Sequence, residues 1–155
     1  DMLDSSIKEM RRVAHNMMPE ILVRYGLDTA LKGFCNEIDR SGVIRTSYQS
    51  IGMDKVELEQ TASVTIYRIV QELVNNVIKH ARAKTALVQL HYSGQEKLLA
   101  VTVEDDGKGF DAVMLERSDG IGWSNIRNRV EFLKGKIDIK SAPGKGTSVL
   151  IEIGM

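Results

Sequence analysis

The chain has 155 residues, of which 43% are hydrophobic and 27% are charged, a composition typical of one globular domain rather than of a disordered or collagen-like protein. Lysine plus arginine and aspartate plus glutamate number 21 each, so no basic excess indicates direct binding to nucleic acid or to a membrane surface. The single cysteine, Cys35, excludes an internal disulfide and a cysteine zinc site, and we interpret it as a packing residue.

No apolar run approaches the ~20 residues that a membrane span needs, and the first ten residues carry no secretion signal. These features predict a soluble, cytoplasmic domain.

The first predicted element is a helix over residues 2–18. Its apolar residues alternate steps of four and three, the spacing of a helix that packs in a bundle or coiled coil: Leu3, Ile7, Met10, Ala14 and Met17. Pro19 ends or offsets this helix, and residues 19–26 are predicted to form a linker. The N-terminal helix therefore needs a partner helix.

A second helix is predicted over residues 28–40, ending at Ser41-Gly42, and a first strand over residues 43–51, which are rich in β-branched and aromatic side chains. The next element, residues 64–83, has the clearest periodicity in the chain. Its apolar residues recur at helical spacing along one stripe: Ile66, Ile69, Val70, Leu73, Val74, Val77, Ile78 and Ala81.

The opposite stripe of this helix is polar and consists of Glu72, Asn75, Asn76, Lys79 and His80. Such a stripe is ordinarily a solvated face, but two adjacent asparagines are poor helix formers in mid-helix. Carboxylate and amide oxygens followed by cationic groups would suit a magnesium-phosphate ligand.

Residues 86–92 and 99–105 alternate between apolar and polar side chains and predict two strands joined through Ser93-Gly94 as a hairpin. Asp105 continues the phase of Val101 and Val103, so it should point toward the core side of the sheet and requires a donor there.

After the loop DDGKGF and a polar segment, the sequence GIGWSNIRNRVEFLKG opens on glycines and predicts another helix. Two strands follow, over residues 136–142 and 147–153, joined by PGKG as a tight turn.

The glycines invite nucleotide motifs, each of which must fit its context. The P-loop pattern is absent. Gly107, Gly109 and Ala112 satisfy the dinucleotide pattern, but their strand belongs to a hairpin and no acidic residue ends a following parallel strand. We therefore regard the dinucleotide match as a false positive.

Together, however, four segments resemble a known family in its own order. YRIVQELVNNVIKHARA is similar to the N box of the ATP-binding domain of sensor histidine kinases, and DDGKGF, GIGWSNIRNRV and SAPGKGTSVLIEI resemble its three glycine boxes. This is the Bergerat ATPase fold, shared with gyrase B and mismatch-repair ATPases. EMRRVAHNMMPEILVRYGLDTAL is similar to the end of the dimerisation helix and linker in the subfamily that usually works with LuxR-type (NarL-like) response regulators.

The resemblance implies an α/β two-layer sandwich with a mixed sheet of about five strands covered on one face by helices, preceded by an N-terminal helix. It implies that residues 1–18 end a dimerisation helix hairpin, that residues 19–26 are a linker and that residues 27–155 form the catalytic domain, with ATP and Mg²⁺ as cofactors. Expected partners are the dimerisation helices of a homodimeric kinase and a response regulator. The domain would be the cytoplasmic part of a membrane-anchored sensor.

The same resemblance assigns roles within the helix of residues 64–83. Asn76 would ligate Mg²⁺, and Lys79 and His80 would contact the phosphates. Glu72 matches an acid that orients the nucleophile in hydrolytic relatives, and in a kinase it would position the metal site.

For the adenine, the resemblance implies that Asp105 accepts a hydrogen bond from the amino group and that Thr147 assists. Glycines would let the backbone approach the nucleotide and hinge the intervening lid, roughly residues 111–119: Gly107, Gly109, Gly120 and Gly122. Trp123 departs from the leucine that is usual in the family, and it packs either the lid or a gap.

His15 is the tempting phosphoacceptor, but Asn16 follows it where the subfamily has an acidic residue, so we expect the acceptor to lie outside this chain. Two alternatives remain: an anti-sigma-factor serine kinase, which lacks a dimerisation helix, and a module that senses ATP without transferring phosphate.

Overall fold

The computed structural model describes residues 20–109 and 123–155, and the predicted helix of residues 2–18 and the lid of residues 111–119 lie outside these ranges. The helices are α2 (Glu20–Tyr25), α3 (Leu27–Ser41), α4 (Gln60–Asn76) and α6 (Trp123–Phe132), with the short turns η1 (Met53–Lys55) and η2 (Val77–Ala81). The strands are β1 (Arg45–Ile51), β2 (Thr85–Ser93), β3 (Leu98–Asp105), β4 (Lys136–Ser141) and β5 (Thr147–Gly154).

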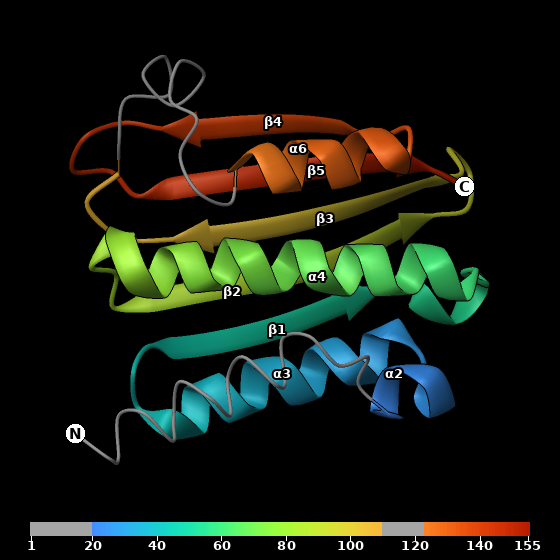
Figure 1. The fold of residues 1–155 in the computed structure, drawn as a ribbon, viewed down its shortest axis with the longest axis horizontal. Coiled ribbons are helices and arrows are strands. Elements are labelled where there is room, and N and C mark those ends of the chain that lie inside the picture. The colour runs from blue at the N-terminus through green and yellow to red at the C-terminus, as the bar shows by residue number, and fades with distance from the viewer. Residues whose placement is uncertain (1–19, 110–122) are drawn as a thin grey trace.

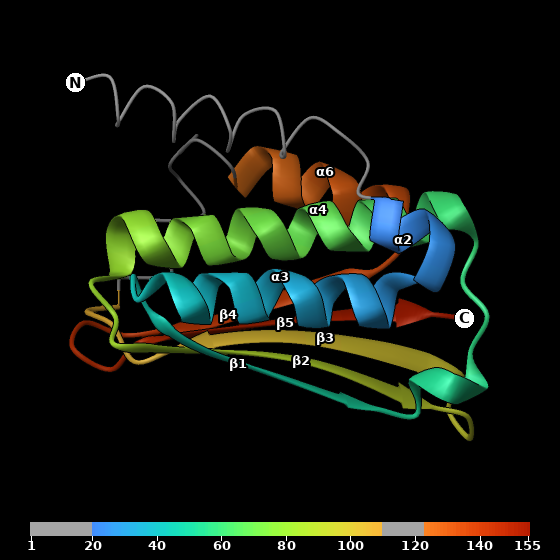
Figure 2. The same cartoon turned by 90° about the horizontal axis from the view of Figure 1, so that it is seen from below.

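The strands form one five-stranded sheet in the order β1-β2-β3-β5-β4 (Figure 1). β1 and β2 are parallel and are joined through α4, whereas the other pairs are antiparallel, so the sheet is mixed. Figure 2 shows α3, α4 and α6 all on one face of this sheet. The predicted two-layer α/β sandwich is therefore confirmed.

The core lies between the sheet and the apolar stripe of α4, as the periodicity predicted. Ile66, Ile69, Val70, Leu73 and Val74 are each at most 3% exposed. Inward residues of β2, β3 and β5 complete this layer: Val88, Leu90, Leu99, Val101, Val103, Val149, Ile151 and Ile153. This packing fixes the rotation of α4 about its axis, and with it the direction of the polar stripe.

Two features of α4 differ from the prediction of one helix over residues 64–83. The helix begins at Gln60, and after Asn76 the backbone continues as the π-helical turn η2. Arg82, in the left-handed conformation with φ 49°, then ends the helical path. Lys79 and His80 therefore lie on a widened turn, a feature often found at functional sites.

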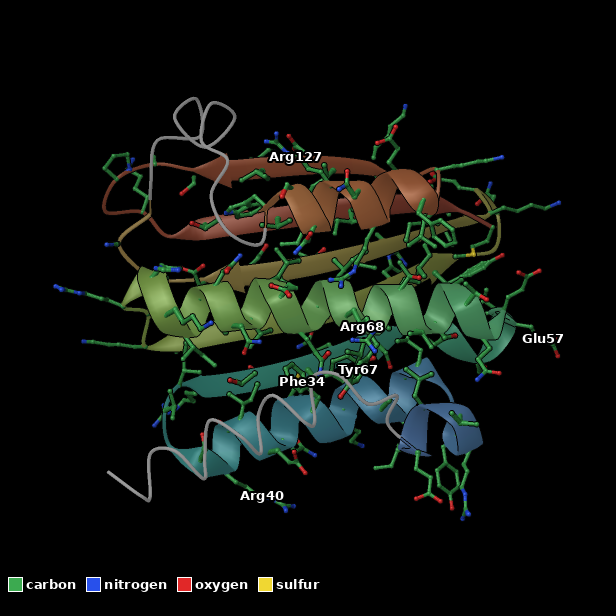
Figure 3. All side chains as sticks on the ribbon, in the orientation of Figure 1. Phe34, Arg40, Glu57, Tyr67, Arg68 and Arg127 are labelled. Carbon is green, nitrogen blue, oxygen red and sulfur yellow. The ribbon has the colours of Figure 1, made fainter. Side chains whose placement is uncertain are left out.

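The first helices pack closely on this layer. Phe34 of α3 and Tyr67 of α4 meet edge to face with ring centroids 5.9 Å apart (Figure 3). The predicted stop at Ser41-Gly42 is confirmed, because α3 ends at Ser41 and Gly42 adopts the left-handed conformation with φ 77°.

The segment predicted as a linker, residues 19–26, contains α2, whose Leu22 is buried in the core. Cys35 is 1% exposed, as predicted for a packing residue, and burial raises the pKa of its thiol to about 12. Within residues 20–109 and 123–155, no helix has the length and apolar character that a membrane crossing requires.

Candidate nucleotide-binding site

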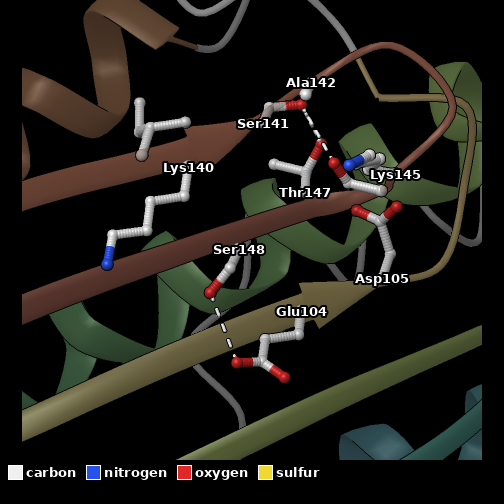
Figure 4. A pocket seen from close by; sticks show the side chains of 10 residues that line it. Glu104, Asp105, Lys140, Ser141, Ala142, Lys145, Thr147 and Ser148 are labelled. Carbon is white, nitrogen blue, oxygen red and sulfur yellow. Dashed lines mark hydrogen bonds between the residues drawn. The ribbon is translucent and has the colours of Figure 1, made fainter.

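The ends of β3 and β5 bring the two predicted adenine residues together. Asp105 and Thr147 are cross-strand partners in the antiparallel pair, so their side chains lie on the same face. Ser141, the last residue of β4, pairs with Thr147, and the two hydroxyl oxygens are 2.8 Å apart (Figure 4). The three side chains form a row of polar groups at one end of the sheet.

This row borders a cavity of about 630 Å³. Its lining comes from β3, β4, β5 and the turn between the last two, and it includes residues of both sheet faces: Glu104, Asp105, Ile139, Lys140, Ser141, Ala142, Lys145, Gly146, Thr147 and Ser148. On the face away from the helices, the Ser148 hydroxyl donates to Glu104 (3.3 Å). Asn76, on α4, is not among the residues that line the cavity, so the cavity includes only part of the predicted site.

The carboxylate of Asp105 is half-buried, as its phase in β3 predicted. Burial raises its pKa above the ordinary value of 3.8, and the nearby charge of Asp106 adds to the rise. The backbone N–H of Gly107 donates to Asp105 Oδ1 (2.8 Å) and opposes this shift, as does the N–H of Thr147. A further donor, such as an exocyclic amino group, would stabilise the ionised form.

That environment predicts a pH-dependent affinity for adenine nucleotides. The ionised Asp105 is a stronger acceptor for an amino group than the protonated form, so binding should weaken as pH falls through its raised pKa, by at most about tenfold per pH unit. Calorimetric titration with ADP from pH 7 downward would measure the slope. Asp105→Asn should remove this part of the slope and leave the part due to the phosphates, and equal slopes in both proteins would contradict the assignment.

The neighbouring carboxylate, Asp106, is fully exposed and makes different contacts. Its Oδ1 accepts from the backbone N–H groups of Lys84 and Thr85, both at 2.8 Å. Both bonds lower the pKa of Asp106, and the bond from the Thr85 N–H has the larger effect. Sequence reasoning missed this residue, although its place directly after the inward-facing Asp105 was a signal that the two carboxylates point apart.

The loop of residues 105–109 is held against the end of η2. The N–H of Lys108 donates to the Ala81 carbonyl (2.7 Å). A Cβ added at Gly107 would overlap that carbonyl oxygen and lie 2.8 Å from the Ala81 Cβ. The absence of a side chain at Gly107 is therefore what permits this approach.

The turn between β4 and β5 holds the loop from the other side. The N–H of Gly144 donates to the Lys108 carbonyl (2.6 Å). Gly109 has φ +66°, which favours glycine, and a Cβ there would lie 2.9 Å from the Ala142 carbonyl carbon. The predicted glycine boxes around residues 107 and 146 therefore meet as one packed backbone unit.

The polar stripe of α4 ends beside this unit. Glu72 and Asn76 are half-buried and one turn apart on α4, and Lys79 and His80 are exposed on η2. The Nδ2 atom of Asn76 is buried and has no hydrogen-bond partner in the structure. Figure 1 shows that α4 and β3 end at the same edge of the molecule.

Two predicted residues, Gly120 and Gly122, lie outside the described residues, as does the lid. Trp123 begins α6, is half-buried and packs against the main core cluster. Ser141 is a second residue that sequence reasoning missed. The sequence feature that could have indicated it is its place just before the turn in SAPGKGT. In the structure it pairs across that turn with Thr147.

A mixed sheet with helices on one face and a polar pocket beside glycine-rich turns defines an α/β nucleotide-binding domain. The chain belongs to the histidine kinase-, DNA gyrase B-, and HSP90-like ATPase family, whose model matches residues 61–155.

Within that family the chain is similar to histidine kinases. It is 30% identical to the signal transduction histidine-protein kinase/phosphatase DegS of Brevibacillus brevis, over 98% of this chain and 38% of DegS. It is 31% identical to the sensor histidine kinase ComP of Bacillus subtilis, over 99% of this chain and 20% of ComP.

Among solved structures, the histidine kinase domain of the Erythrobacter litoralis EL346 blue-light activated kinase is similar with a TM-score of 0.63 and 29% identity, over 80% of this chain and 57% of that domain. The chain thus spans less than two fifths of the length of DegS and ComP. It is similar over nearly its whole length to histidine kinases, and its residues 61–155 correspond to their ATP-binding domain.

Proposed function

We propose that this chain is the catalytic part of a two-component sensor histidine kinase, which transfers the γ-phosphoryl group of Mg-ATP to a histidine on a dimerisation helix for relay to a response-regulator aspartate. The observation that carries the proposal is the pairing of Asp105 with Thr147 at the cavity. The loop that follows Asp105 is hydrogen-bonded to the end of η2, which continues the helix that carries Asn76.

At the cavity, Asp105 accepts from the adenine amino group, and Thr147 supports the same edge of the base. The half-buried carboxylate supports this role because it lines the cavity and the Gly107 N–H, 2.8 Å from its Oδ1, holds it in place. The contact between the Ser141 and Thr147 hydroxyls fixes the threonine in position. Gly107 and Gly109 let the loop beside the cavity pack against Ala81 and Ala142.

At the other end, Asn76 fits a magnesium ligand. Its amide is enclosed yet has no bond at Nδ2, and turning the amide by 180° exchanges that nitrogen for the oxygen that a hard cation prefers. Magnesium supplies neutralisation of phosphate charge when it is bound. Lys79 and His80, exposed on the next turn, contact the phosphates, and Glu72, one turn earlier, positions the Asn76 amide.

The chemistry of this domain is therefore positioning and charge stabilisation of a phosphoryl group, with the nucleophile supplied by the dimerisation helices. We propose a homodimer through those helices, a response regulator of the LuxR (NarL-like) type as the next acceptor, and a cytoplasmic location below a membrane-anchored sensor. The similarity to DegS and ComP supports this reading over an anti-sigma-factor serine kinase or an ATP-sensing module.

The test is phosphoryl transfer from γ-labelled Mg-ATP. With the dimerisation hairpin of the same kinase supplied in trans, we expect acid-labile label on the hairpin and almost none on this chain. Acid-stable label on serine would favour the anti-sigma-factor type, and ATP binding without any transfer would favour the sensing module. Acid-labile label on this chain that is lost in His15→Gln would contradict our expectation that His15 is not the acceptor.

A further inference from the structure

Building on the proposed function, we propose that Asp106 is a positioning residue for adenine recognition: its carboxylate anchors the 105–109 loop to the start of β2, and so aims Asp105 at the base. The family resemblance and the comparisons assign this residue no role.

The anchor is a fork on a single oxygen atom. Lys84 N–H and Thr85 N–H both donate to Asp106 Oδ1 at 2.8 Å, and the Asp106 N–H approaches the Thr85 carbonyl at 3.4 Å. The last paired residue of β3 is Asp105, opposite Ala86, so the fork acts where the chain leaves the sheet. It therefore fixes the direction in which the loop departs.

The fork affects the orientation of Asp105 through the backbone of the loop. The Gly107 N–H that holds Asp105 Oδ1 at 2.8 Å is the next amide after Asp106. Lys108, one residue further, is bonded to the Ala81 carbonyl at 2.7 Å. If the fork is lost, the backbone between Asp105 and Lys108 is held less tightly, and the Gly107 amide holds the Asp105 carboxylate in a less defined orientation.

The two adjacent carboxylates differ in exposure and in what they contact. Asp105 is half-buried at the cavity, whereas Asp106 is exposed and does not line it. An exposed carboxylate adds little to stability by its charge. Two backbone donors on one oxygen nevertheless fix the position of Asp106 relative to the start of β2. Such positioning matters because displacement of a binding group by about an ångström weakens recognition.

The experiment measures selectivity for the adenine amino group. Titration calorimetry with ATP and with purine riboside triphosphate, which lacks that group, gives a ratio of dissociation constants for each variant. We expect Asp106→Ala to lose about tenfold of the preference for ATP while its affinity for the deamino analogue stays close to that of the unsubstituted chain. Asp106→Glu, which keeps the charge but moves the oxygen, should lose as much.

Asp106→Asn is the conservative rescue, because its Oδ1 can still accept from both amides, and it should keep most of the preference. In an Asp105→Ala background, Asp106→Ala should add almost nothing, since the residue acts through Asp105. Asp138→Ala, at an exposed position on β4, is the matched control and should leave both affinities unchanged.

Unchanged selectivity in Asp106→Ala and Asp106→Glu would overturn the role, and so would an equal loss for both nucleotides or full additivity with Asp105→Ala. Should the alanine variant fail to fold, the glutamate and asparagine variants decide by the same ratio. Failure of the unsubstituted chain to bind ATP would instead overturn the proposed function, and this role with it.

Discussion

Replacing Gly107 with alanine is expected to weaken ATP binding by more than about a hundredfold, because the new methyl group meets backbone rather than a flexible side chain. The added Cβ would overlap the Ala81 carbonyl oxygen and lie 2.9 Å from its carbon. The loop must then move away from η2, which breaks the bond from Lys108 N–H to that carbonyl. Calorimetric titration would measure the loss.

Gly94→Ala is the matched control for this change. Gly94 lies in the turn between β2 and β3, and a Cβ there has no neighbour within 4 Å. This variant should bind ATP as the unsubstituted chain does. Affinity in Gly107→Ala within about threefold of the unsubstituted chain would show that the contact between the loop and η2 does not shape the site.

Replacing Asn76 with alanine is expected to abolish the magnesium dependence of ATP binding and to slow phosphoryl transfer by ~10²–10³-fold in the full-length kinase. The reason is that the enclosed amide, which has no bond at Nδ2, is the group proposed to ligate the metal. Titrations with and without Mg²⁺, followed by single-turnover labelling, would measure the two effects.

The neighbouring amide provides the control. Asn75 is half-buried on the same turn of α4 and has no proposed contact with the ligand, so Asn75→Ala should keep the magnesium dependence. If Asn76→Ala titrations with and without Mg²⁺ still differ as in the unsubstituted chain, Asn76 is not the metal ligand.

The parts of this molecule that the sequence predicted are those governed by local periodicity. The stripe from Ile66 to Val74 is buried as expected, because helical spacing alone decides which side chains share a face. The inward direction of Asp105 followed from alternation along β3 in the same way. Its pairing with Thr147 depended on the resemblance to the family, since no local pattern specifies which strands become neighbours.

The parts that the sequence did not predict depend on backbone atoms and on contacts distant in the chain. The Lys108 N–H donates to the Ala81 carbonyl, and a residue of any type at position 81 would present the same carbonyl. The widened turn of η2 changes hydrogen-bond partners without changing the apolar stripe. Helix α2 lies in the segment that was predicted to be a linker because of Pro19 and Gly26. Its Leu22 is nevertheless buried in the core.

The position of Asp105 and Thr147 on neighbouring strands also affects how the domain is completed during folding. β2 and β3 form a local hairpin, but β5 reaches β3 only after α6 and β4 have been traversed, so the two residues meet through a long-range contact. If ATP binds between them as proposed, it would stabilise only chains in which β5 has docked, in proportion to the logarithm of its concentration. In a cell with abundant ATP, the nucleotide would therefore protect this domain from partial unfolding and proteolysis at its C-terminal strand.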